Sequence, residues 1–132
     1  MKYLLDTNVC IKYINGDSEA VKLKLQSYRP EDILLCSVVK SELIYGVLKS
    51  TNKSKNVEKL KKFFAPFVSL PFDDDCAMIY GEIRSSLEKT GKLIGAYDMQ
   101  IAAIALRNNI ILVTHNVKEF SRIVKLKIED WE

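Results

Sequence analysis

Histidine and cysteine are scarce in this sequence, with one histidine and three cysteines among 132 residues. Cys10, Cys36 and Cys76 are odd in number, far apart and surrounded by apolar neighbours. They form no Cys-X-X-Cys pair, so we expect buried free thiols in a reducing compartment. A zinc centre built from several histidines and cysteines is therefore not expected.

Long apolar runs are also missing. No stretch approaches the roughly 20 apolar residues that a membrane-spanning helix needs. Near the start of the sequence, Asp6, Asn8 and Lys12 occupy positions where a signal peptide needs an apolar core. We therefore expect a cytoplasmic protein with no membrane association. The length is that of one unit with one core, so we predict a single domain over residues 1–132.

Short apolar runs alternate with segments of helical periodicity along the whole chain. Runs that predict strands lie at 3–5, 33–36, 68–70, 110–114 and 124–128. Segments that predict helices lie at 9–14, 18–28, 38–48, 57–66, 73–90, 96–107 and 117–123. Strands separated by helices predict an α/β fold with a mostly parallel sheet and helices on both faces. Because the strands are continuously apolar, we expect each to be covered on both sides.

Two acidic residues lie where a helix should be apolar. On a helix that begins at Ala96, Asp98 falls at the centre of the apolar arc. Glu42 lies on the apolar side of the helix from Val38, and neither Lys40 nor Lys49 is well placed to neutralise it. Burying an ionised carboxylate costs several kcal/mol unless something compensates it. Both positions therefore indicate a bound cation.

Asp6 adds a third carboxylate, at the carboxyl end of the first predicted strand, where open α/β sheets bind ligands. Oxygen ligands with almost no imidazole favour Mg²⁺ or Mn²⁺, which suit hydrolysis of a phosphodiester by an activated water. Helix capping is the competing interpretation for Asp6 and Asp98, since both lie near predicted helix starts. It does not apply to Glu42, which lies in the second turn.

The same residues carry a resemblance to a known family. The segments that match lie in one order along nearly the whole chain: Leu4-Leu5-Asp6-Thr7-Asn8, Ser37-Val38-Val39, Glu42-Leu43-Ile44-Tyr45-Gly46, Ile83-Arg84, Gly91, Ile94-Gly95-Ala96-Tyr97-Asp98-Met99-Gln100-Ile101-Ala102-Ala103, Leu112-Val113-Thr114-His115-Asn116, Phe120 and Glu129-Asp130-Trp131. With these motifs the chain resembles the PIN-domain ribonuclease toxins of the VapBC toxin–antitoxin systems.

The resemblance implies a PIN-like α/β/α sandwich and a toxin that inhibits translation and growth until its antitoxin neutralises it. It implies an endoribonuclease that cuts structured RNA, with tRNA the favoured substrate. Asp6, Glu42 and Asp98 would be the catalytic metal-binding acids, with Mg²⁺ as cofactor and Mn²⁺ as the alternative. The implied partners are a VapB-type antitoxin, a second toxin copy in a homodimer, and operator DNA through the antitoxin complex.

The sequence departs from the family where many members have a fourth acid, since it reads Thr114-His115-Asn116 there. Asn116 adds no charge, which disfavours a second metal in the free enzyme. Glu119 either replaces the missing acid or lies in the first turn of the next helix, which we favour slightly. Thr7 is expected to orient Asp6 or a phosphate, or equally to cap its helix. Thr114 and Asn116 are further supporting residues.

Six lysines between residues 49 and 62 are candidates for guiding an RNA backbone, Lys49, Lys53 and Lys55 foremost, although a solvated helix face is the plainer interpretation. Asp73, Asp74 and Asp75 open a predicted helix and are interpreted as caps. His115 is interpreted as structural.

Two other functions compete with the ribonuclease. One is a regulator that keeps the fold and binds RNA, or represses DNA with its antitoxin, without cutting. The other is a phosphatase with Asp6 as nucleophile, which the absence of a second aspartate in Asp-Thr-Asn disfavours.

Overall fold

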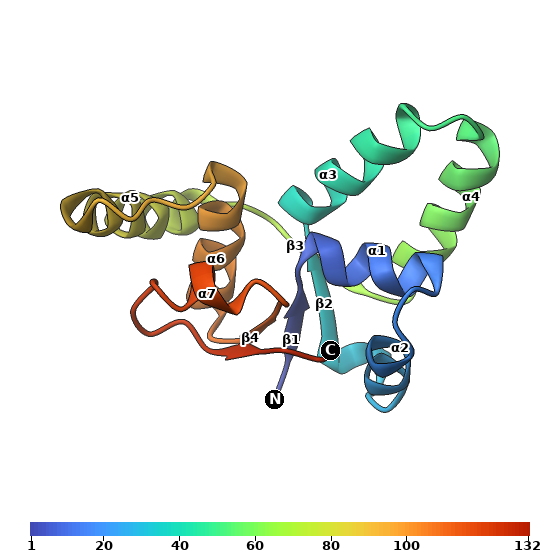
Figure 1. Cartoon of the computed structure of the whole chain (residues 1–132), viewed down its shortest axis with the longest axis horizontal. Helices are drawn as coiled ribbons and strands as arrows, with labels where there is room; N and C mark the ends of the chain where they lie inside the picture. Colours follow the sequence, from blue (N-terminus) through green and yellow to red (C-terminus); the bar gives the residue numbers. More distant parts are fainter.

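Five parallel strands form one sheet in the computed structural model, which describes residues 1–132 (Figure 1). The strands are β1 (Tyr3–Leu5), β2 (Ile33–Cys36), β3 (Val68–Leu70), β4 (Ile111–Val113) and β5 (Ile128–Glu129), in the order β3-β2-β1-β4-β5. Every neighbouring pair is parallel. The chain first builds outward from β1 through β2 to β3, and then returns to the other side of β1 with β4. This reversal is the position at which open α/β sheets bind ligands, beyond the carboxyl ends of the strands.

Helices cover both faces of the sheet. They are α1 (Thr7–Asn15), α2 (Glu19–Gln26), α3 (Ser37–Leu48), α4 (Lys53–Phe64), α5 (Asp74–Thr90), α6 (Ala96–Asn108) and α7 (Val117–Phe120), with a 3₁₀ turn at Pro30–Asp32. Figure 1 shows α1 to α4 on one side of β1 and β2 and α5 to α7 on the other. The predicted α/β/α sandwich is confirmed. None of the helices has the length and apolar character that crossing a bilayer requires.

The buried apolar side chains form one contiguous cluster centred on the sheet. Every residue of β1, β2 and β4 is buried. Helix α6 reaches the centre of this core because Ala102, Ala103 and Ala105, all with no exposed surface, let its backbone approach its neighbours closely. The three cysteines are buried and free, as predicted.

Helix ends follow the signals in the sequence. The Oδ1 atom of Asp73 accepts a hydrogen bond from the Cys76 backbone N–H at 3.0 Å, so Asp73 is the cap that its position predicted. Asp75 pairs instead with Arg107 at 2.9 Å. Gly91 ends α5 with φ 67°, a left-handed conformation that favours glycine.

The sheet edges differ from expectation. Both outer strands were predicted to be covered, yet Val68 in β3 is 60% exposed and β5 is only half-buried. Each has a strand neighbour on one side only, which leaves its outer edge without cover. Strand β5 is also shorter than predicted and begins at Ile128. Lys125 has φ 71°, so the preceding segment turns where a strand would need extended backbone.

Several helix boundaries differ from the predicted ones, those of α4 and α7 most clearly. Helix α4 begins at Lys53, within a polar segment that did not predict a helix, and it ends at Phe64. Helix α7 ends at Phe120 rather than at residue 123.

Candidate metal centre

Asp6 lies where β1 ends and α1 begins. Its backbone N–H donates to the Val113 carbonyl at 3.0 Å, so the pairing with β4 continues to this residue. The side chain is 6% exposed and both of its oxygens are hydrogen-bonded. Oδ1 accepts from the Thr7 backbone N–H and Oδ2 from the Thr114 hydroxyl, each at 2.8 Å. Burial raises the pKa of Asp6, while these two hydrogen bonds oppose the rise. The Asp6 side chain therefore caps α1, and its carboxylate is buried and hydrogen-bonded.

Glu42 reaches the same region from the second turn of α3. Its Oε1 atom accepts a hydrogen bond from the Thr7 hydroxyl at 2.9 Å. The lysines of this helix point elsewhere, because Lys40 lies over the Phe64 ring and Lys49 over the Tyr45 ring, each at 4.8 Å from the ring centroid. Neither lysine neutralises Glu42, as their positions on the helix relative to Glu42 predicted.

Asp98 approaches from the first turn of α6. Gly95 occupies the cap position of this helix, and the Asp98 carboxylate makes no capping hydrogen bond. Burial raises the pKa of Asp98 to about 6, with further contributions from the negative charges of Asp6, Glu42 and Glu119. Asp98 therefore lies in the first turn of α6 without making a capping hydrogen bond.

The negative charges of Asp6 and Glu42 both act on Asp98, and no lysine or arginine pairs with any of the three acids. The seven ion pairs of the molecule include none that involves Asp6, Glu42 or Asp98. Three carboxylates from three different segments thus share one half-buried region, at the carboxyl edge of the sheet where its strand order reverses. Such a set favours a divalent ion with oxygen ligands.

Glu119 belongs to this region more closely than its position in the sequence suggested. It does lie in the first turn of α7, as expected, but its charge also acts on Asp98. Its Oε2 atom accepts a hydrogen bond from the Asn116 side-chain amide at 3.1 Å. The Asn116 backbone N–H donates to the Thr114 hydroxyl at 3.0 Å, which ties this loop to Asp6. The sequence could have indicated this contact, because residues three apart at the start of a helix, such as Asn116 and Glu119, lie on the same face.

The contact of the Thr7 hydroxyl differs from the expected one. The sequence favoured an interaction with Asp6 or a helix cap, whereas the hydroxyl donates to Glu42 and only the backbone N–H serves Asp6. Thr7 is the first residue of α1, and its side chain projects across to α3. One residue therefore orients two of the three carboxylates.

Two thiols lie close to these acids without adding charge. Burial raises the pKa of Cys36 to about 11, and the charges of Asp6 and Glu42 contribute to the rise. Burial also raises the pKa of Cys10. Both thiols are therefore protonated at neutral pH.

The six lysines of positions 49–62 are all exposed. Among them, Lys59 lines a cavity of about 300 Å³ that Glu42 also lines. The same lysine lines an adjacent groove of about 490 Å³, together with Lys22, Lys62 and aromatic side chains. Lys59, Lys22 and Lys62, here called the basic path, therefore line two adjacent hollows that extend from Glu42 toward α2 and α4. Lys53 and Lys55 line neither hollow.

Comparisons with known proteins agree with this geometry. The PIN domain family matches residues 3–126. Ribonuclease VapC2 of Rickettsia felis is 40% identical over 133 residues, which cover 100% of this chain and 99% of that protein. The tRNA(fMet)-specific endonuclease VapC of Salmonella typhimurium is 34% identical over 131 residues, which cover 99% of this chain and 98% of that protein.

A solved structure shares the whole fold. The crystal structure of VapBC2 from Rickettsia felis bound to a DNA fragment from their promoter contains a chain that superposes with a TM-score of 0.93 at 39% identity. The match covers 100% of both chains. The protein therefore belongs to the PIN-domain family, among the VapC ribonucleases.

Proposed function

We propose that this protein is the toxin of a type II toxin–antitoxin system and a Mg²⁺-dependent endoribonuclease with Asp6, Glu42 and Asp98 as its metal ligands. The observation that carries the proposal is the convergence of three carboxylates with no cationic partner. Carboxylate oxygens are the ligands that Mg²⁺ and Mn²⁺ prefer, and the two neighbouring thiols are protonated. The whole chain, residues 1–132, acts as one PIN domain in this proposal.

The residues around the acids have separate tasks. Thr114 orients Asp6 and Thr7 orients Glu42. The Asp98 carboxylate accepts no hydrogen bond within the chain and is available to a ligand. When bound, the cation supplies a water of lowered pKa and compensates charge on the phosphate. Asn116 and Glu119 close the site on the α7 side, where they would orient waters.

The proposed substrate is structured RNA, with tRNA as the first candidate. The tRNA(fMet)-specific relative from Salmonella typhimurium, 34% identical over nearly the full length, supports this choice. The basic path that includes Lys59 provides positive charge beside the acids, as a phosphate backbone requires.

The proposed partners are a VapB-type antitoxin and a second copy of this chain, with operator DNA bound only through the antitoxin complex. The related structures of VapBC proteins with DNA support this assembly. Inhibition of translation and growth would follow from cleavage of RNA in the cytoplasm when the antitoxin is absent.

The test is digestion of total bacterial RNA by the purified, antitoxin-free protein, with Mg²⁺ or with EDTA, followed by sequencing of the new RNA ends. Wild type is compared with Glu42→Gln and with Glu82→Gln, an exposed acid on α5 that serves as the matched control. We expect discrete cuts that require Mg²⁺, that Glu82→Gln retains and that Glu42→Gln loses.

RNA that is bound yet uncut by folded wild-type protein, with metal present, would favour the regulatory function. Equal cleavage by wild type and Glu42→Gln would instead remove the assigned acids from the reaction.

Removing the Thr7 hydroxyl is expected to release Glu42 from its orientation. In Thr7→Val, the affinity for Mg²⁺ should fall about 10-fold or more, the range for residues that orient metal ligands. Isothermal titration calorimetry of the metal-free protein measures this effect. Thr7→Ser keeps the hydroxyl and should bind Mg²⁺ as wild type does; a loss of equal size in both variants would contradict the role of the hydroxyl.

The lysines offer a comparison of two pairs of positions on α4. If RNA follows the basic path, the double variant Lys59→Gln, Lys62→Gln should reduce the salt dependence of RNA binding, with a slope smaller by about one or two ions. Lys53→Gln, Lys55→Gln removes the same charge from the same helix, outside the path, and should change the slope less. Filter binding between low and physiological salt measures both. Equal slopes for the two variants would indicate nonspecific attraction to the helix.

A further inference from the structure

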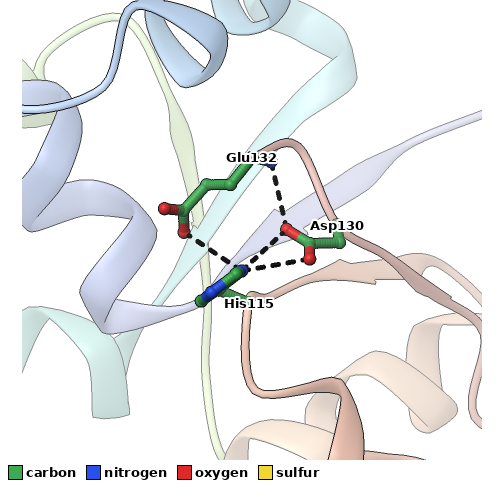
Figure 2. Close-up of side chains that lie close together, drawn as sticks. All are labelled: His115, Asp130 and Glu132. Carbon is green, nitrogen blue, oxygen red and sulfur yellow. Dashed lines mark hydrogen bonds and ion pairs between the residues drawn. The ribbon is translucent and has the colours of Figure 1, made fainter.

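A second group of potential ligands lies beside the proposed metal centre and has no part in it. His115, Asp130 and Glu132, here called the C-terminal cluster, point toward one another (Figure 2). The His115 Nδ1 atom lies 3.0 Å from Oδ2 and 3.2 Å from Oδ1 of Asp130, and 3.6 Å from Oε2 of Glu132. One ligand atom from each residue lies within 4.8 Å of the others.

The fold builds this cluster from two segments. The Thr114 backbone N–H donates to the Glu129 carbonyl at 3.0 Å, so the residues that follow, His115 and Asp130, leave β4 and β5 side by side. Trp131 is then buried and stacks on the Tyr28 ring at 5.5 Å. With Trp131 turned inward, its two neighbours Asp130 and Glu132 both face His115, as alternate residues of an extended segment do.

Each carboxylate of the cluster makes a further contact besides the one to His115. Lys12 contacts Oε1 of Glu132, which leaves Oε2 facing the imidazole. The backbone N–H of Glu132 donates to Oδ1 of Asp130 at 3.0 Å. The Glu132 and Asp130 side chains are 17% and 32% exposed and the His115 side chain is 60% exposed, so the cluster lies at the surface. Outer contacts of this kind orient ligands in metal sites.

The Nδ1 atom alone does not satisfy these oxygens. Oδ1 of Asp130 accepts from the Glu132 backbone N–H, which leaves Oδ2 of Asp130 and Oε2 of Glu132 facing one nitrogen that carries at most one proton. A divalent ion in the same place would contact the nitrogen and both carboxylates at once. Zinc ligands at about 2.0–2.2 Å from the ion lie roughly 3.4 Å from one another in a tetrahedral shell. The separations of 3.0 Å and 3.6 Å between Nδ1 and the nearest oxygens of Asp130 and Glu132 lie on either side of that value.

We propose that the C-terminal cluster binds a divalent transition-metal ion of the Zn²⁺ type, through Nδ1 of His115 and one oxygen each of Asp130 and Glu132. The imidazole ligand selects such an ion over Mg²⁺, which the three-carboxylate centre prefers. A cavity of about 400 Å³ lined by His115 and Glu132 is lined also by Asp6 and Asn116. The cavity leaves room for water or a phosphate oxygen as a further ligand. This site stands independently of the proposed ribonuclease activity.

The single histidine of the chain makes the test direct, because every imidazole signal of a tag-free sample comes from His115. Zn²⁺ is titrated into ¹⁵N-labelled, metal-free protein while the imidazole nitrogens are followed by long-range ¹H–¹⁵N NMR. We expect the Nδ1 resonance to shift to an end point at one equivalent. The same shift is expected in Asp98→Asn, which removes an acid of the other centre. Mg²⁺ in large excess should leave the resonance in place.

Asp130→Asn keeps the shape of the side chain and removes its charge, so Zn²⁺ should shift His115 with at least about 10-fold weaker affinity. His115 resonances that do not respond to Zn²⁺, or that respond equally in wild type and Asp130→Asn, would overturn the site. Displacement of Zn²⁺ by comparable Mg²⁺ would overturn the assigned class of ion. Thermal unfolding of each variant establishes that it is folded.

Discussion

Replacing Asp98 by asparagine is expected to abolish RNA cleavage and to stabilise the metal-free protein at the same time. Metal-ion catalysis supplies several kcal/mol, so loss of a ligand should lower kcat/KM by on the order of 10³-fold or more. The gain in stability follows from the raised pKa of Asp98, which shows that its charged form is disfavoured in the folded state. Asparagine keeps the shape of this side chain and removes its charge.

The stabilising effect of Asp98→Asn depends on pH, because it appears only where Asp98 is ionised in the wild type. The pKa of Asp98 rises from 3.8 to about 6 on folding, so its protonated form favours the native state below pH 4. That contribution is lost as the pH rises through 6. Above pH 6 the variant should therefore be more stable than wild type, by about 1–2 kcal/mol after allowance for a half-exposed carboxyl. The difference should shrink toward zero near pH 4.

Urea denaturation in EDTA at pH 4, 6 and 8 measures this difference, with Glu82→Gln as the control that should follow wild type. Mg²⁺ should reverse the order, because it stabilises only the protein that binds it. A variant that is less stable than wild type at pH 8 without metal would show that Asp98 is satisfied by groups of the protein itself. In that event the case for a cation at this position would weaken.

Replacing Trp131 by alanine is expected to lower the free energy of unfolding by about 3 kcal/mol, the low end for a buried aromatic side chain. Trp131 is 5% exposed and its ring lies 5.5 Å from Tyr28 and 5.6 Å from Tyr3. Its Nε1–H also donates to Glu129 at 3.0 Å, within the two-residue strand β5. The loss corresponds to a fall in Tm of roughly 10 °C for a chain of this size.

Trp131→Phe separates packing from hydrogen bonding. It keeps an aromatic ring against Tyr3 and Tyr28 and should cost only about 1 kcal/mol, much of it for the lost N–H donor. Differential scanning calorimetry of both variants gives the comparison. An alanine variant with wild-type Tm would show that the last residues are detached from the fold in solution, and β5 would then contribute nothing to stability.

Sequence periodicity predicted the three acids because each breaks a local rule. Asp98 and Glu42 occupy apolar faces of their helices, and Asp6 ends an apolar strand. These are features of neighbouring residues, within one turn or one strand, and local backbone geometry fixes them. The same reasoning predicted the cap at Asp73 and the left-handed stop at Gly91, which the structure confirms.

Contacts between distant segments lay beyond that reasoning. The hydroxyl of Thr114 reaches Asp6 across 108 residues, and that of Thr7 reaches Glu42 across 35. Which carboxylate each hydroxyl serves depends on how strands and helices pack, and no periodicity encodes it. The association of Glu119 with Asp98 arises in the same way, as does the meeting of His115 with the last residues of the chain.

The sequence by itself determined the fold class, the helix ends at Asp73 and Gly91 and the free cysteines, because local propensity and hydrophobic periodicity express these directly. From the same patterns it predicted the three acids as metal ligands. The tertiary structure alone decided which edge strands are exposed, which hydroxyls orient Asp6 and Glu42, and that the single histidine faces two carboxylates. The physical reason is the strand order β3-β2-β1-β4-β5. It brings the ends of β1, β2 and β4 to one edge, and only this arrangement turns distant residues into neighbours.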